Sequence, residues 1–238
     1  MKRCYFVLLL LGFLSVFPVD AQSISAEEVL QKAIDFHDPN GNWENLNTSF
    51  KVVMETPERP ERTSIIGVDF PQQQFTLDVN QNGNSYSYII AKDSCEITLN
   101  GSEDFSDEEA EEFRLNCERG NTMKDYYTYL YGLPMKLNDP GTHLDPNVYH
   151  KTFKGKKYLV LKITYDAEVG KDTWYFYFDP TTYAMEVYQF YHDESKNDGE
   201  YILLSGLEEI NGIKMPKTRA WYLNKGDKYL GADTLEKI

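Results

Sequence analysis

Residues 158–223 read YLVLKITYDAEVGKDTWYFYFDPTTYAMEVYQFYHDESKNDGEYILLSGLEEINGIKMPKTRAWYL. Apolar and polar residues alternate along much of this stretch, as expected when successive side chains of a strand point to opposite faces. Turn sequences interrupt the alternation, and Asp-Gly or Asn-Gly between alternating runs is a strong local signal for a β-hairpin. The stretch therefore predicts a meander of antiparallel hairpins. Its turns are expected at 179–182, 197–199 and 211–212.

Upstream of this meander, five more alternating runs lie between residues 50 and 99. Ser25 to Glu28 has the pattern of a capping box, and apolar residues recur at helical spacing as far as His37. Two further helices are predicted, an acidic one from Asp107 to about Leu115 and another from Asn121 to Tyr131. About eleven strands and three segregated helices predict an α+β fold, mainly antiparallel β, in which a curled sheet carries the helices on its concave face. A conventional closed barrel is the alternative.

Residues 1–21 have the features of a secretory signal peptide. Lys2 and Arg3 precede an apolar run from Phe6 to Phe17, and Val19-Asp20-Ala21 is a small-residue cleavage signal. The run is short for a membrane span, so we expect cleavage before Gln22 and no transmembrane segment afterwards. A retained N-terminal anchor is the alternative. Residues 22–238 contain no obvious linker or repeat and are expected to form a single domain.

The chain is strongly acidic, with 24 Lys and Arg against 38 Asp and Glu and a net charge of −14. A nucleic-acid-binding protein needs clustered cations to displace counterions from phosphates, so this composition argues against such a partner. Anionic membrane surfaces would also repel the chain as a whole.

Cys95 and Cys117 are the cysteines that remain after the expected cleavage. An even pair in an exported protein is a candidate disulfide, and the loop of roughly 20 residues would give about 3 kcal/mol of stabilisation. Two buried thiols that never meet are the alternative.

No motif for catalysis, metal binding or a cofactor is found. The four histidines lack zinc-site spacing, and no nucleophile elbow, phosphate loop or EF-hand pattern occurs. His192, Asp193 and Glu194 fall at an expected hairpin tip, where charged residues are ordinarily solvated. The sequence therefore predicts no catalytic residue, no metal and no cofactor. A glycan-directed hydrolase remains an alternative, because paired carboxylates are recognised only by their spacing in three dimensions.

Aromatic residues are in surplus, with 18 Tyr, 13 Phe and 3 Trp. They indicate either an apolar cavity for a lipid or acyl ligand, or a core that the rings simply fill.

The order of elements, with one N-terminal helix followed by a long strand meander, resembles the LolA/LolB-like family of lipoprotein carriers and its exported relatives. The turn within Phe178–Met185 is similar to the family's Asp-x-x-Thr hairpin, and Ile210–Pro216 is similar to its Asn-Gly-Ile-x-x-Pro turn. The resemblance implies a half-open β-barrel of about eleven strands, with about three helices covering an apolar cavity. It places no partner-docking residue on this sequence.

These observations lead to the expectation of an exported protein, periplasmic or else secreted, that binds an apolar ligand such as a lipid or a lipoprotein acyl chain without chemistry. Alternatives are an envelope interaction module with a filled core, which would bind a protein partner, and a secreted hydrolase. Strand alternation predicts that seven residues line the cavity, and the loop from Tyr131 to Pro146 is expected to supply Leu133 and Met135 as lid contacts. The seven strand residues are Val52, Met54, Val68, Leu77, Trp174, Phe176 and Tyr188.

Overall fold

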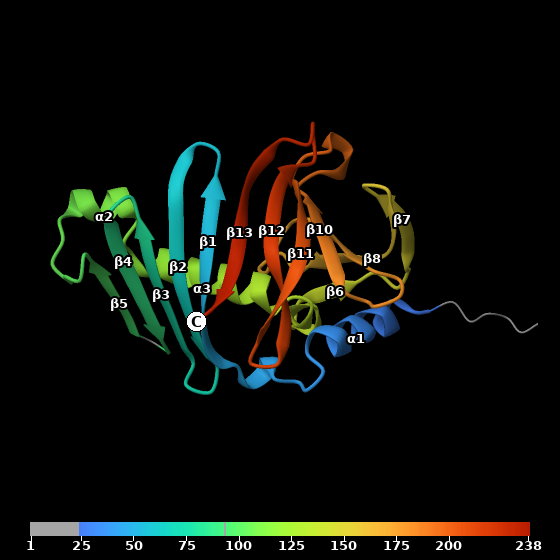
Figure 1. Cartoon of the computed structure of the whole chain (residues 1–238), viewed down its shortest axis with the longest axis horizontal. Coiled ribbons are helices and arrows are strands. Elements are labelled where there is room, and N and C mark those ends of the chain that lie inside the picture. Colours follow the sequence, from blue (N-terminus) through green and yellow to red (C-terminus); the bar gives the residue numbers. More distant parts are fainter. Residues whose placement is uncertain (1–23, 93) are drawn as a thin grey trace, which may run out of the picture.

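A single large antiparallel sheet organises the protein. The computed structural model describes residues 24–92 and 94–238, and within them thirteen strands form one sheet (Figure 1). Its order is β5-β4-β3-β2-β1-β13-β12-β11-β10-β9-β8-β6, with β7 also paired to β8. Because the two ends of this order are not paired with each other within the described residues, the curled sheet stays open. The strands are β1 (Asn47–Thr56), β2 (Arg59–Asp69), β3 (Gln74–Gln81), β4 (Asn84–Ala91), β5 (Ser94–Leu99), β6 (Thr142–Leu144), β7 (Tyr149–Phe153), β8 (Lys156–Tyr165), β9 (Thr173–Phe178), β10 (Met185–Tyr191), β11 (Glu200–Ile210), β12 (Ile213–Leu223) and β13 (Tyr229–Lys237).

Helices cover the concave face of this sheet. Three α-helices and three short 3₁₀ turns occur in the described part of the chain, and α3 runs across the sheet behind its central strands (Figure 1). This arrangement confirms the predicted α+β fold with a half-open curled barrel. The helical elements are α1 (Ala26–His37), η1 (Trp43–Asn45), α2 (Asp107–Phe113), α3 (Cys117–Gly132), η2 (Met135–Asn138) and η3 (Glu194–Lys196).

Two glycines allow α3 to lie close to its neighbours. A Cβ at Gly120 would come within 2.8 Å of the Tyr88 ring, and one at Gly132 within 2.2 Å of Trp43. Arg219 of β12 is fully buried and donates a hydrogen bond to the Leu130 carbonyl at 3.3 Å. This bond holds the other end of the helix on the sheet. The helix is therefore held against both halves of the sheet.

Turn chemistry fixes the hairpins that the sequence predicts. Asn211 and Gly212 both have positive φ, of 50° and 78°, which is the geometry of a two-residue hairpin turn. Asp179 accepts the backbone N–H groups of Thr181 and Thr182 at 2.8 and 2.9 Å and pairs with Lys156 at 2.8 Å. The Lys156 ammonium and these N–H groups lower the pKa of the Asp179 carboxyl.

Both faces of the sheet are apolar around β8 to β10, where only one covered face was expected. Phe176 and Tyr188 point into the main core, whereas Tyr177 and Val187 join a second cluster on the opposite face. A β-bulge between Met185 and Val187 changes which face the following residues occupy. The aromatic surplus is thus divided between two clusters.

The boundaries of the middle helices differ from those predicted. Helix α2 ends at Phe113, because Arg114 adopts a left-handed conformation, and Asn116 then caps a new helix at Cys117. Strand β6 lies in the segment that was expected to be an irregular loop. The predicted signal peptide lies outside the described residues, and no helix of the described part is long and apolar enough to span a membrane.

Candidate functional site

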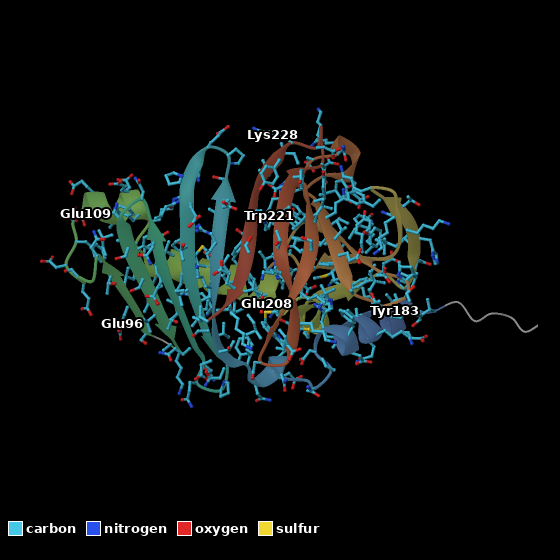
Figure 2. All side chains as sticks on the ribbon, viewed as in Figure 1. Glu96, Glu109, Tyr183, Glu208, Trp221 and Lys228 are labelled. Atoms are coloured by element: carbon cyan, nitrogen blue, oxygen red, sulfur yellow. A yellow bond between two sulfur atoms is a disulfide. The ribbon has the colours of Figure 1, made fainter. Side chains whose placement is uncertain are left out.

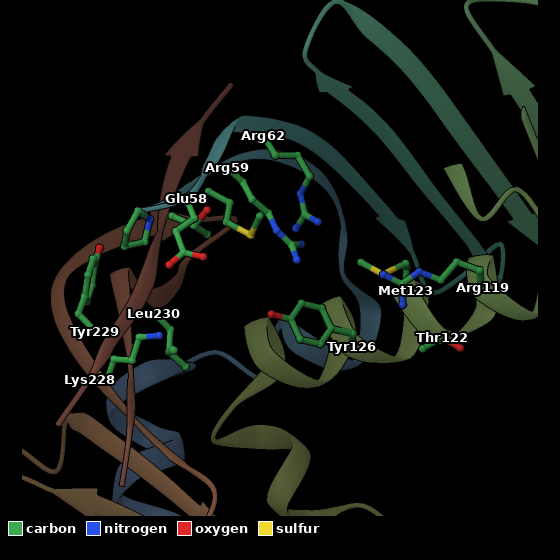
Figure 3. A pocket seen from close by; sticks show the side chains of 13 residues that line it. Glu58, Arg59, Arg62, Arg119, Thr122, Met123, Tyr126, Lys228, Tyr229 and Leu230 are labelled. Atoms are coloured by element: carbon green, nitrogen blue, oxygen red, sulfur yellow. The ribbon is translucent and has the colours of Figure 1, made fainter. Parts of the chain in front are cut away.

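A hollow of about 600 Å³ opens at one rim of the concave face. It lies between helix α3 and two hairpin turns, β1–β2 and β12–β13, and Figure 3 shows it from close by. The tip of the β12–β13 hairpin is marked by Lys228 in Figure 2. The hollow is lined by Met54, Thr56, Pro57, Glu58, Arg59, Arg62, Arg119, Thr122, Met123, Tyr126, Lys228, Tyr229 and Leu230.

Cationic side chains converge on this hollow from separate elements. Arg59 and Arg62 extend from β2 toward α3, on which Arg119 lies (Figure 3). Lys228 adds a fourth cation, and Glu58 is the single carboxylate in the lining. The site is therefore positive although the whole chain carries a net charge of −14.

Arg62 occupies a half-buried position at the back of the hollow. Its Nη2 donates to the Tyr127 hydroxyl at 3.3 Å, and that hydroxyl contacts Ser64 at the same distance. Burial opposes the charge of Arg62, but the nearby Tyr127 and Tyr86 hydroxyls and Asp233 outweigh it and raise its pKa. Among the described residues, the Arg62 Nε and the Thr56 hydroxyl are buried without a hydrogen-bond partner. Both residues line the hollow.

A smaller hollow of about 190 Å³ adjoins the first and shares Met54, Thr56, Tyr126 and Leu230 with it. Asp233 and Glu200 line it. Burial raises the pKa of the Asp233 carboxyl, and the opposing effect of Arg219 and Arg62 is smaller. Burial also raises the pKa of Glu200. The smaller hollow therefore disfavours negative charge, in contrast to the first.

A separate hollow of about 580 Å³ lies on the other side of Tyr126. Trp174 lines it and stacks on Phe176 with a ring separation of 5.9 Å. The Tyr129 and Tyr165 hydroxyls are hydrogen-bonded at 2.5 Å within the same wall. Its polar residues are mostly carboxylates and hydroxyls, so it lacks the positive charge of the first hollow.

The structure separates the nine predicted ligand-contacting residues into two groups. Met54 and Trp174 are partly exposed, and each lines a hollow. The other seven are packed in the main hydrophobic core, including the two residues expected in a lid. These seven are Val52, Val68, Leu77, Leu133, Met135, Phe176 and Tyr188.

Sequence reasoning did not find the arginine cluster. Arg59 and Arg62 lie in a charged segment with prolines at positions 57 and 60, and this segment was not interpreted as a site. Arg119 is about 60 positions further along the chain. No sequence signal marks the cluster: only the structure shows that three of the six arginines of this acidic chain face one hollow.

A disulfide joins Cys95 of β5 to Cys117, the first residue of α3. It therefore ties the N-terminal end of α3, which carries Arg119, to the edge of the sheet.

His192 pairs with Asp172 at 2.7 Å, and Glu194 pairs with Lys162. No cluster of three or more metal-ligating side chains occurs in the described ranges.

The chain is similar in structure to the LolA superfamily protein NE2245 from Nitrosomonas europaea. The TM-score is 0.50 with 10% identity, covering 90% of this chain and 93% of that one. A DUF1329 family protein from Desulfovibrio piger ATCC 29098 gives a TM-score of 0.46 with 7% identity, covering 89% and 91%. An outer membrane lipoprotein-sorting protein domain from Vibrio parahaemolyticus gives 0.45 with 10% identity, covering 89% and 92%.

At this identity, the likeness to the LolA superfamily protein shows the fold, which is the one expected from the turn motifs. No curated protein matches the sequence. A family model, by contrast, matches residues 2–237, nearly the whole chain. The chain belongs to DUF6503, a family of unknown function.

Proposed function

We propose that this protein is an exported binding protein that holds an apolar ligand in its half-open barrel and catalyses no reaction on it. The ligand is a lipid, an acyl chain or a lipoprotein anchor. The observation that carries this proposal is the hollow of about 600 Å³ beside α3, with Met54, Met123 and Leu230 in its lining. Ligand pockets of proteins typically measure about 300–1,000 Å³ and are mainly apolar. The hollow is thus of a size suited to a single chain of a lipid, and these three side chains give it an apolar part.

Burial alone is sufficient to provide affinity at such a site. Each CH₂ group removed from water contributes about 0.8 kcal/mol, and the surplus over ordering costs appears as binding. The unbranched Met54 and Met123 side chains can adapt to a flexible chain. The LolA superfamily fold and the predicted signal peptide support the same function and a periplasmic location.

The experiment uses the mature chain and 1-monooleoylglycerol, a neutral single-chain lipid, with native mass spectrometry as the readout. The wild-type protein is expected to bind one molecule. Leu230→Gln places a polar group in the hollow and is expected to weaken binding about 5- to 10-fold, since apolar contact is lost. Leu207→Gln is the matched control, because Leu207 is exposed on β11, and its affinity should equal that of the wild type.

An interaction module is the second candidate, and a specific observation favours it. Seven of the nine residues predicted to contact ligand are packed in the core, so much of the concave face is filled by the protein itself. A folded wild-type protein that takes up no monooleoylglycerol at any concentration, and instead retains one stoichiometric protein partner from its own envelope, would support the module and contradict lipid binding.

A further inference from the structure

The four cations around the rim hollow have no ion-pair partner among the described residues, so their charge is available to a ligand. Eight lysines form ion pairs with Asp or Glu in the described part of the chain. Arg59, Arg62, Arg119 and Lys228 form none among the same residues, despite the excess of carboxylates in the chain. Glu58 and the buried Asp233 are the nearby carboxylates, so the four cations outnumber their counter-charges, and an anion bound among them would reduce their mutual repulsion.

Unused hydrogen-bonding capacity points to the same place. The Arg62 Nε and the Thr56 hydroxyl are buried without partners among the residues described, and both line this hollow. Both groups are therefore free to donate a hydrogen bond to a molecule bound in the hollow. A guanidinium presents its donors in a planar fork that matches the oxygens of a phosphate or a carboxylate.

Other residues of the hollow have the opposite character. Met54, Met123 and Leu230 face the space that the arginines border, and Trp221 and Ala232 extend the apolar lining into the adjoining smaller hollow. Asp233 and Glu200 also line the smaller hollow, and Glu58 lies at the exposed rim of the first. An anion is therefore favoured at the arginines and disfavoured in the smaller hollow, where an aliphatic chain would find apolar contacts.

We propose that this hollow binds an anionic amphiphile, whose phosphate or carboxylate head group is held by Arg59, Arg62 and Arg119 while its aliphatic chain extends over Met54 and Leu230. This rests on the proposed function and names the ligand class of the same site. The Thr56 hydroxyl is placed to donate a further hydrogen bond to the head group.

The test compares two lipids that differ only in the head group, 1-oleoyl lysophosphatidate and 1-monooleoylglycerol, below their micelle concentrations. The wild-type protein is expected to bind the phosphate-bearing lipid at least about tenfold more tightly. Arg59→Gln/Arg119→Gln should remove this preference and change the affinity for monooleoylglycerol less than about twofold. Lys157→Gln/Lys171→Gln, which removes the same charge from exposed positions on β8 and in the β8–β9 connection, should retain the preference.

Inorganic phosphate is the third probe and separates a lipid head group from a free anion. The affinity for inorganic phosphate is expected to be about a hundredfold or more below the affinity for lysophosphatidate. Equal affinity for the two would overturn the amphiphile and assign the site to a soluble anion. Equal affinity for the two lipids would overturn the head-group site while leaving the proposed function intact, whereas binding of neither lipid would contradict both.

Discussion

At the scale of single residues, His37 shows how one buried side chain holds a helix on the sheet. It is fully buried, its Nδ1 lies 2.5 Å from the Lys214 carbonyl oxygen, and its Nε2 accepts the Met185 N–H at 3.0 Å. Only the neutral ring with a proton on Nδ1 satisfies both partners. Burial lowers the pKa of His37 to about 4, and the nearby Lys214 and Arg219 charges act in the same direction.

This lowered pKa makes stability depend on pH. Between pH 6.5 and about 4 the unfolded chain binds a proton at His37 that the folded protein excludes. The contribution of neutral His37 to the free energy of unfolding is therefore complete above pH 6.5. It is lost as the pH falls from 6.5 to about 4, by about 1.4 kcal/mol per pH unit. Urea unfolding of the wild type and of His37→Gln at pH 7, 6 and 5 measures it. The variant should be less stable at pH 7 and lose less stability on acidification; parallel pH profiles would contradict this role.

At the scale of elements, the disulfide between β5 and α3 offers a direct prediction. The bridge closes a loop with a sequence separation of 22, and it constrains the unfolded chain. Cys95→Ser/Cys117→Ser is expected to lower the free energy of unfolding by about 3 kcal/mol. Reductant should destabilise the wild type by the same amount and leave the variant unchanged. Two titratable thiols in unreduced, denatured wild-type protein would show that the bridge does not form.

At the scale of the whole molecule, α3 couples the two halves of the sheet. Tyr88 of β4 donates to the Arg114 carbonyl just before this helix, and Arg219 of β12 donates to Leu130 near its end. The sheet itself is continuous from β5 to β6. A cooperative structure of this kind is expected to unfold in one transition, although its length exceeds that of most simple two-state domains.

The three tryptophans make this cooperativity measurable. Trp43, Trp174 and Trp221 lie outside strands β2 to β5, whereas far-ultraviolet circular dichroism reports on every strand. The two signals should give the same urea midpoint, and reducing the Cys95–Cys117 bridge should shift both equally. Separate midpoints would show that the β2–β5 region unfolds independently.

The sequence allowed the fold to be predicted better than the site, for a physical reason. A hairpin turn such as Asn211-Gly212 depends on residues next to one another, so its signal is local. Alternation also gave the correct face for Val52 and Phe176, which point into the main core. It could not distinguish a face that lines a cavity from one that the protein fills, because that depends on how closely α3 approaches.

The arginine site could not be predicted from the sequence for a related reason. Arg59 and Arg119 belong to different elements, and they line the same hollow only because α3 crosses the sheet beside the β1–β2 turn. The start of α3 was itself misplaced, since the left-handed Arg114 that separates it from α2 has no distinctive sequence pattern. Long-range geometry therefore creates this site from residues that look like an ordinary solvated surface.

The rim hollow lies on two hairpin turns, apart from the core that maintains the fold. Arg59 and Lys228 are exposed and contribute nothing to the hydrophobic core, while the core residues behind them keep the sheet and α3 in place. Exposed turn residues are generally exchanged at little cost in stability. Sequence changes in these two turns can therefore alter the shape and charge of the hollow while the barrel stays the same.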